Sequence, residues 1–169
     1  MIMNKTHNPN DTPLHLATRS SCSLEVMSSL LQKGVNINAR NKAGWAPLHI
    51  AVVENSYNKA KMLLEAGADV NATIPNQEDD TPLHLVAWTN NVKMAKLLIA
   101  YGANLNLYGE EGTPLETAHH YAANDVKRLI QAELYKREVR RARISARHPQ
   151  RIVTRKWCVK HYHPGRSYV

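Results

Sequence analysis

Short apolar stretches alternate with polar turns along most of this chain, at a spacing that favours paired helices. The first apolar positions are Leu48, Ile50 and Ala51, residues 54–56 are polar, and a second apolar stripe covers residues 62–64. The stripe returns at residues 94–99. Each stripe fits one face of a helix with about 3.6 residues per turn. A single short pair cannot bury its own apolar face, so the pattern predicts helix pairs that pack against one another.

The helix pairs repeat at a nearly constant interval. The first motif occurs at spacings of 34, 35 and 32 residues, as TPLHLA (12–17), APLHIA (46–51), TPLHLV (81–86) and TPLETA (113–118). A second motif repeats in step with it, as KGVNIN (33–38), AGADVN (66–71) and YGANLN (101–106). Two motifs in constant phase identify a repeat architecture.

Local signals set the ends of the predicted helices. Threonines 12 and 81 are good N-caps, and a proline follows at the first helical position in each repeat, at residues 13, 47, 82 and 114. Glycines 34, 67 and 102 come directly after the second helices, where a left-handed residue ends a helix without strain. A last helix is expected to start near Asp125 and to stop near Arg147, before Pro149.

The TPLH-type motif at a period near 33 residues resembles the ankyrin repeat. The resemblance covers residues 7 to about 135, as four repeats at about 7–39, 40–72, 73–107 and 108–135. It implies an all-α solenoid of helix-turn-helix units with projecting β-hairpin-like fingers. Residues 1–6 would be an N-terminal extension, and residues 136–169 a basic C-terminal helix and tail.

The resemblance also implies a structural role for the motif histidines, which are His15, His49 and His84. In ankyrin-like repeats this ring bonds the adjoining loop and holds one finger to the next. Ala46 replaces the motif threonine in the second repeat, so the hydrogen-bond network of His49 should be weaker there. Glu116 replaces the histidine in the fourth repeat, as expected of a terminal repeat with relaxed requirements.

Motifs for catalysis or cofactor binding are missing from the sequence. We find no phosphate-binding glycine loop, nucleophile elbow or HExxH motif, and we expect no enzyme activity, no catalytic residue and no cofactor. Cys158, His161 and His163 offer three zinc ligands without an evident fourth, so we interpret them as a chance cluster and expect no metal site. Cys22 and Cys158 are expected to be reduced thiols.

Protein binding is the function that the resemblance implies, through fingertips and exposed residues of the first helices. Trp45, Trp88 and Tyr121 are expected to form an exposed aromatic stripe, because tryptophan and tyrosine anchor interfaces. The alternative is that Trp45 and Trp88 fill gaps between repeats. The predicted partner-binding positions are Asp11, Arg19, Ser20, Lys42, Trp45, Val53, Glu54, Asp79, Asp80, Trp88, Thr89, His120 and Tyr121.

Charge divides the chain into two parts. Residues 1–135 hold 11 Lys and Arg against 13 Asp and Glu, whereas residues 136–169 hold 11 Lys and Arg against one acid, Glu138. Three interpretations of this tail stay open: a solvated extension, a nuclear localisation signal, or a contact with nucleic acid or an anionic membrane surface. The cationic candidates are Lys136, Arg137, Arg140, Arg141, Arg143, Arg147, Arg155 and Lys156.

Together these features predict a non-catalytic adaptor that is monomeric alone and binds a partner protein of unknown identity. The alternative is a nucleic-acid-binding or nuclear protein that uses the basic tail. A third possibility is a segment of a larger protein. No apolar run approaches the roughly 18 residues of a membrane span, and no signal peptide is evident, which favours the cytoplasm, the nucleus or delivery into a host cell.

Overall fold

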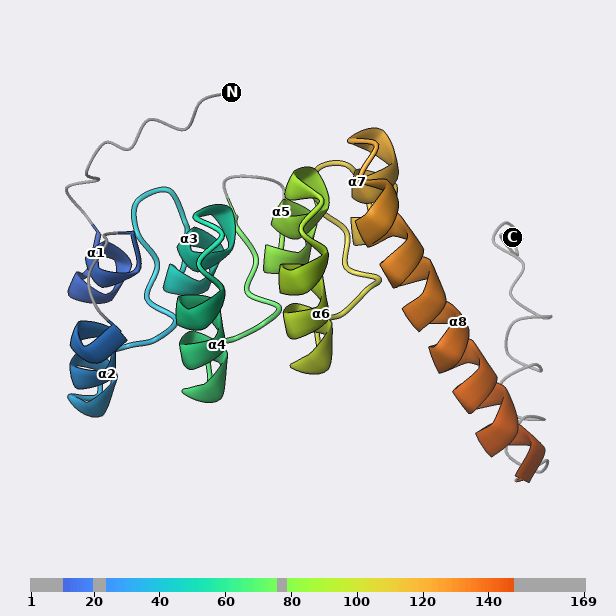
Figure 1. Ribbon diagram of the computed structural model, residues 1–169, viewed down its shortest axis with the longest axis horizontal. Coiled ribbons are helices and arrows are strands. Elements are labelled where there is room, and N and C mark those ends of the chain that lie inside the picture. Colours follow the sequence, from blue (N-terminus) through green and yellow to red (C-terminus); the bar gives the residue numbers. More distant parts are fainter. Residues whose placement is uncertain (1–10, 20–23, 76–78, 148–169) are drawn as a thin grey trace, which may run out of the picture. The chain divides into compact units, whose positions relative to one another are not determined.

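Eight helices make up the described part of the chain, which comprises residues 11–19, 24–75 and 79–147 of a computed structural model (Figure 1). The chain divides into two units, Met1–Gln131 and Ala132–Val169. The helices are α1 (Pro13–Arg19), α2 (Leu24–Gln32), α3 (Pro47–Val53), α4 (Tyr57–Glu65), α5 (Pro82–Thr89), α6 (Val92–Ala100), α7 (Pro114–His120) and α8 (Asn124–Arg147). We call α1, α3, α5 and α7 the inner helices, and α2, α4 and α6 the outer helices.

The helix ends lie where the local signals predict them. Every inner helix begins at its motif proline, whose fixed φ suits the first helical position and whose missing N–H has no partner to lose there. Gly67 follows α4 with a φ of 91°, and its N–H donates to the carbonyl of Leu64. This left-handed residue ends the outer helix and turns the chain toward the next repeat.

Stacking of like helices builds the core of the first unit. Each inner helix contacts the next, in the order α1, α3, α5, α7, and the outer helices follow the order α2, α4, α6 (Figure 1). The apolar residues of the predicted stripes lie between them: Leu48, Leu63, Met94 and Leu98 are each 0–1% exposed. The all-α repeat fold predicted from the sequence is confirmed.

The loops that lead from an outer helix to the next inner helix, which we call fingers, are joined by asparagine side chains. The Asn38 Oδ1 accepts the N–H of Asp69 at 2.9 Å, and the Asn71 Oδ1 accepts the N–H of Asn104 at 2.8 Å. The expected hairpin character is limited: in the described residues the fingers form isolated bridges, Ile74 with Asp80 and Gly109 with Gly112.

A buried lysine connects the first two repeats. Lys59 on α4 is 9% exposed, and its Nζ donates to the carbonyls of Ala17 at 2.8 Å and Thr18 at 3.0 Å. These carbonyls belong to the last turn of α1, where a helix lacks internal partners and carries partial negative charge. The ammonium group therefore satisfies the end of α1 from the neighbouring repeat.

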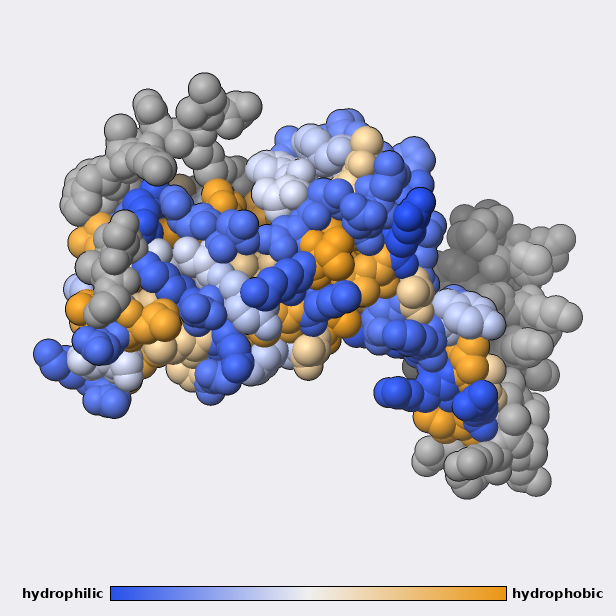
Figure 2. Space-filling model, in the orientation of Figure 1, coloured by the Kyte–Doolittle hydropathy of each residue, from blue (hydrophilic) through white to orange (hydrophobic). Residues whose placement is uncertain are grey.

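Hydrophilic side chains predominate on the face of the first unit that Figure 2 shows, and smaller apolar areas lie between them. Helix α8 begins in the first unit, where Val126 and Ile130 are 0% exposed, and it is helical to Arg147, the last described residue. Among the described helices, none combines the length and apolar content needed to cross a membrane.

Candidate functional site

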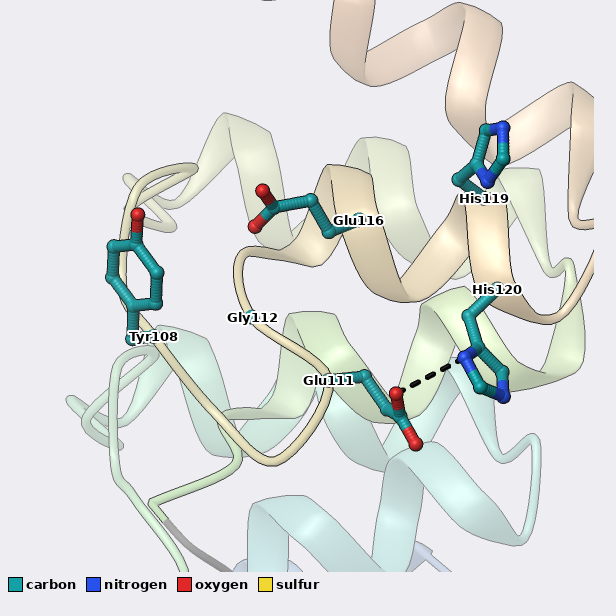
Figure 3. Close-up of a pocket in the computed structure, with 6 residues that line it drawn as sticks. All are labelled: Tyr108, Glu111, Gly112, Glu116, His119 and His120. Atoms are coloured by element: carbon teal, nitrogen blue, oxygen red, sulfur yellow. Dashed lines mark ion pairs between the residues drawn. The ribbon is translucent and has the colours of Figure 1, made fainter.

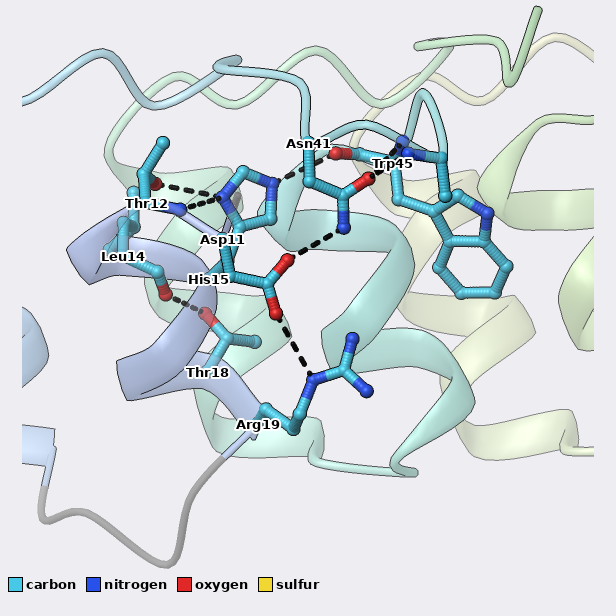
Figure 4. Close-up of polar contacts among 9 residues, drawn as sticks. Asp11, Thr12, Leu14, His15, Thr18, Arg19, Asn41 and Trp45 are labelled. Carbon is cyan, nitrogen blue, oxygen red and sulfur yellow. Dashed lines mark hydrogen bonds and ion pairs between the residues drawn. The ribbon is translucent and has the colours of Figure 1, made fainter. Parts of the chain in front are cut away.

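His15 is held at both ring nitrogens (Figure 4). The N–H of Thr12 points to Nδ1 at 3.2 Å, and the Thr12 Oγ1 lies 2.7 Å from the same nitrogen. Because a backbone N–H can only donate, Nδ1 is the acceptor and the ring proton lies on Nε2. That proton is donated to the carbonyl of Trp45 at 2.8 Å, in the next finger.

His49 and His84 repeat this arrangement one and two repeats further along. The Nε2 of His49 lies 2.8 Å from the carbonyl of Ala72, and that of His84 lies 3.0 Å from the carbonyl of Gly112. At His84 both the N–H and the Oγ1 of Thr81 face Nδ1, at 3.0 and 2.8 Å. At His49 the N–H of Ala46 is the donor at 3.0 Å, and alanine has no hydroxyl to add.

Burial keeps these three rings neutral. Desolvation is the largest cause that lowers the pKa of His15 and of His84, and it lowers the pKa of His49 to about 4. A neutral ring with both nitrogens in hydrogen bonds has no lone pair left for a metal ion or for a substrate proton. Across the described residues, no three His, Cys, Asp or Glu side chains gather as metal ligands.

The acid before the motif threonine faces the next finger in two repeats. The Asp11 Oδ1 accepts a hydrogen bond from the Asn41 side chain at 2.8 Å, and its Oδ2 lies 3.5 Å from the Arg19 Nε (Figure 4). The Asp80 Oδ1 accepts the N–H of Glu110 at 3.1 Å. Asp80 is only 2% exposed, so its expected place on an exposed fingertip is wrong. Its carboxylate serves the contact between fingers.

Trp45 is also buried, at 8% exposure, and the expectation that its ring is exposed is wrong. Its indole packs against the His49 ring, with centroids 6.2 Å apart, and its backbone N–H donates to the Asn41 Oδ1 at 3.0 Å. The backbone of Trp45 is held in place because its carbonyl accepts the hydrogen bond from His15, and this position keeps the ring inside the repeat stack. The ring is therefore packed against His49 of its own repeat and is not available as an exposed anchor.

Trp88, His120 and Tyr121 lie together, and we call them the aromatic cluster. The ring centroids of Trp88 and Tyr121 are 5.6 Å apart, and those of His120 and Tyr121 are 4.8 Å apart. Tyr121 is 43% exposed and Trp88 is half-buried. The cluster joins the ends of α5 and α7, so it spans the third and fourth repeats.

An acidic finger borders the aromatic cluster. The Glu111 Oε2 lies 3.0 Å from the His120 Nδ1, as Figure 3 shows. Burial and the carboxylates of Glu111, Glu110 and Asp80 raise the pKa of Tyr121, because negative charge opposes ionisation of its hydroxyl. Glu110 and Glu111 are not among the partner-binding positions predicted from the sequence. The signal available for them was the pair of acids between two finger glycines.

The remaining predicted positions in the first unit differ in exposure. Arg19 and Val53 are partly exposed, and Ser20 lies outside the described residues. The exposed positions are Lys42, Glu54, Asp79 and Thr89. The structure brings Trp88, His120 and Tyr121 into contact, whereas Lys42 and Glu54 belong to the second repeat.

The second unit presents cations along α8. Lys136, Arg140, Arg141 and Arg143 are exposed, and the Arg137 Nε lies 3.5 Å from the Glu133 Oε1, one turn before it. The side chain of Arg147 is outside the described residues, as are Arg155 and Lys156. Cys22 and the cluster of Cys158, His161 and His163 also lie outside them.

Comparison with known proteins identifies the repeats. Two models of ankyrin repeats match residues 1–74 and 55–118. Human protein phosphatase 1 regulatory subunit 27 is 42% identical over 60 residues, which are 36% of this chain and 38% of that protein. A putative ankyrin repeat protein of Rickettsia bellii is 38% identical over 65 residues, which are 38% of this chain and 27% of that protein.

The chain spans well under half the length of these relatives. Mouse ankyrin repeat and SOCS box protein 11 is 46% identical over 55 residues, 32% of this chain and 17% of that protein. Ankyrin repeats are generally protein-protein interaction modules and typically not enzymes. On these matches and on the fold, the chain belongs to the ankyrin-repeat family.

Proposed function

We propose that this protein is a non-catalytic adaptor that binds a partner protein through the inner helices and fingers of its third and fourth repeats. The observation that carries the proposal is the aromatic cluster, in which Trp88 and Tyr121 pack at 5.6 Å while Tyr121 stays 43% exposed. Tyrosine and tryptophan supply large contact area and lose little conformational entropy on binding. The human relative is named as a regulatory subunit of a phosphatase, which supports action on another protein.

Thr89 and Asp79 extend this surface in the proposal, because both are exposed and belong to the same repeat as Trp88. Lys42 and Glu54 are further candidates in the second repeat. Trp45 and Asp80 are left out, because both are buried. Cytoplasmic or nuclear residence, action inside a host cell and a monomeric state stay predictions.

The test compares two tyrosines that each follow a helix. Tyr121 follows inner helix α7 and is 43% exposed, whereas Tyr101 follows outer helix α6 and is 39% exposed. The full chain is immobilised and captured proteins from a eukaryotic lysate are identified by mass spectrometry. We expect a set of proteins that wild type and Tyr101→Ala retain and the double variant Trp88→Ala, Tyr121→Ala loses. Retention of the same set by a folded double variant would refute the proposal.

A second candidate function is nucleic-acid binding by α8. The observation in its favour is the run of exposed cations Lys136, Arg140, Arg141 and Arg143 within about two turns of helix. Such a run attracts phosphates without sequence preference. The two functions use different units of the chain, so a single protein can have both.

A further inference from the structure

Glu116 reverses the hydrogen-bonding polarity that the other repeats share. In the third repeat the His84 Nδ1 accepts from Thr81, and its Nε2 donates to a carbonyl of the next finger. Glu116 keeps the first half of this pattern, since its Oε2 accepts the N–H and the Oγ1–H of Thr113 at 2.7 and 2.8 Å. A carboxylate cannot supply the second half, because it has no proton to donate. The carboxylate therefore offers an acceptor where the histidines of the other repeats offer a donor.

A cavity of about 440 Å³ opens beside this carboxylate. Figure 3 shows the residues that line it, which are Tyr108, Glu111, Gly112, Glu116, His119 and His120. The Tyr108 ring, from the finger before α7, is 72% exposed. No lysine or arginine is among these lining residues. The cavity thus combines two carboxylates with an accessible aromatic face.

The charge at the cavity favours a cation. Hydrogen bonds from the backbone and the side chain of Thr113 lower the pKa of Glu116, so it is ionised at neutral pH. Glu111 supplies a second carboxylate and is joined to the aromatic cluster through its contact with His120 at 3.0 Å. Burial is the largest cause that raises the pKa of Tyr121, and the nearby carboxylates of Glu111 and Glu110 add to it.

We propose that the cavity of Tyr108, Glu111 and Glu116 binds an arginine side chain of a partner protein. The proposal rests on the adaptor function above and names the chemistry of one partner contact. Both hydrogen bonds from Thr113 to the Glu116 carboxylate use Oε2, and the guanidinium donates toward the side of Oε1. A guanidinium is planar, stacks on an aromatic face and presents several donors, whereas an ammonium is a point charge. The neighbouring aromatic cluster then contacts residues that flank the arginine.

The test uses small probes and the full chain. Nα-acetyl-arginine amide and its neutral isostere Nα-acetyl-citrulline amide are titrated while the amide signals are followed by NMR. The arginine probe is expected to shift the signals of Tyr108, Glu111 and Glu116 saturably, at least tenfold more tightly than the citrulline probe. Added salt should weaken the binding, because it screens the charge pair.

Three variants test whether the binding of the arginine probe depends on the charge of Glu116. Glu116→Gln keeps an oxygen for Thr113 but removes the charge, and should weaken the arginine probe at least fivefold. Glu116→His restores a donor and should abolish the binding. Glu54→Gln, at an exposed glutamate of the second repeat, is the matched control and should bind as wild type. Circular dichroism verifies that each variant is folded.

Equal binding of both probes, shifts confined to other residues, or wild-type affinity in Glu116→Gln would each overturn the arginine site. Those results would leave the adaptor proposal standing if the Trp88 and Tyr121 double variant still loses its captured proteins. The opposite result is also informative. If the arginine probe binds as expected but the double variant still captures the same proteins, the adaptor proposal fails and the arginine site stands.

Discussion

The third residue of each inner helix decides whether its repeat offers a proton donor or an acceptor on its C-terminal side. His15, His49 and His84 present Nε2–H to a carbonyl of the next finger, at 2.8 to 3.0 Å. Each bond stays net favourable because the ring is buried and a broken bond would leave a polar atom without a partner. Neutral rings are required for this, so acid should weaken the contacts.

The first prediction concerns acid and His49, whose pKa is about 4 in the fold against 6.5 in an unfolded chain. A lowered pKa means that the unfolded chain binds protons more readily, so stability is full above pH 6.5 and falls as the pH drops toward 4. His49 alone should cost about 2 kcal/mol at pH 5. Urea unfolding at pH 7 and pH 5 measures the loss. An NMR titration midpoint of His49 near 6.5 in the folded protein would contradict it.

The second prediction concerns Gly109, which lies against the third repeat. A Cβ at this position would stand 2.0 Å from the Asp80 Oδ1 and 3.1 Å from the His84 Nε2. We expect Gly109→Ala to lower the free energy of unfolding by about 2 kcal/mol, since the buried carboxylate must move and lose its hydrogen bond from Glu110. Chemical unfolding measures it.

A double-variant cycle provides the control for Gly109. Asp80→Ala removes the oxygen that the new methyl group would meet, so Gly109→Ala should cost at least about 1 kcal/mol less in that background. Additive costs in the two backgrounds would show that the approach of Gly109 to Asp80 is not what excludes a side chain.

Among the elements, the turn that follows an inner helix takes the same left-handed conformation in three repeats. Asn55, Asn90 and Ala122 have φ values of 53°, 50° and 55°. Asparagine tolerates this conformation, whereas alanine is strained in it. Asn90 also accepts the N–H of Val126 at 3.1 Å, which is one of the N–H groups at the start of α8 that lack a partner within the helix.

The third prediction comes from the alanine in this series. Ala122→Asn should raise the free energy of unfolding by about 0.5 kcal/mol, because asparagine adopts a positive φ at lower cost. The reverse change Asn90→Ala should lower it by about 1.5 kcal/mol, because it adds strain and removes the bond to Val126. Thermal and urea unfolding of both variants measure these shifts. A loss of stability in Ala122→Asn would contradict the assignment of strain.

The fourth prediction concerns the cations of α8. If the second unit binds nucleic acid, replacing Arg140, Arg141 and Arg143 by alanine should flatten the slope of log affinity against log salt by about 2 to 3. Fluorescence anisotropy with a DNA duplex of about 20 base pairs and a single-stranded RNA, at about 50 to 200 mM KCl, measures the slope.

The matched control removes the same charge from the first unit, through Lys33→Ala, Lys61→Ala and Lys96→Ala, and should leave the slope nearly unchanged. Equal slopes in both triple variants would assign the binding to net charge rather than to α8. Absence of salt-dependent binding in wild type would dismiss the second candidate function.

At the scale of the molecule, the sequence predicted those features that depend on nearby residues within one repeat, above all the helix ends. Proline at the start of α3 and glycine after α4 act within a few residues, so they give the helix ends correctly. The order and phase of the motifs then predicted the stacking.

Contacts between repeats were harder to predict. Trp45 and Asp80 stand at fingers that look exposed in the sequence, yet both are buried, Trp45 against His49 and Asp80 against Glu110 of the next repeat. Their burial depends on how closely two fingers approach, which no local pattern encodes. Glu111 was missed for a related reason, because only the fold brings its carboxylate to His120 and the aromatic cluster.

The reactivity of Lys59 toward an amine label can report whether the first repeat is packed against the second. Its side chain is 9% exposed while its amine holds the end of α1, whereas the Lys61 side chain, two residues away on the same helix, is 50% exposed. An amine-reactive label should therefore modify Lys61 at once and Lys59 only in molecules whose first repeat has opened. The ratio of the two labelling rates in one sample gives the fraction of time that this repeat spends detached, without any denaturant.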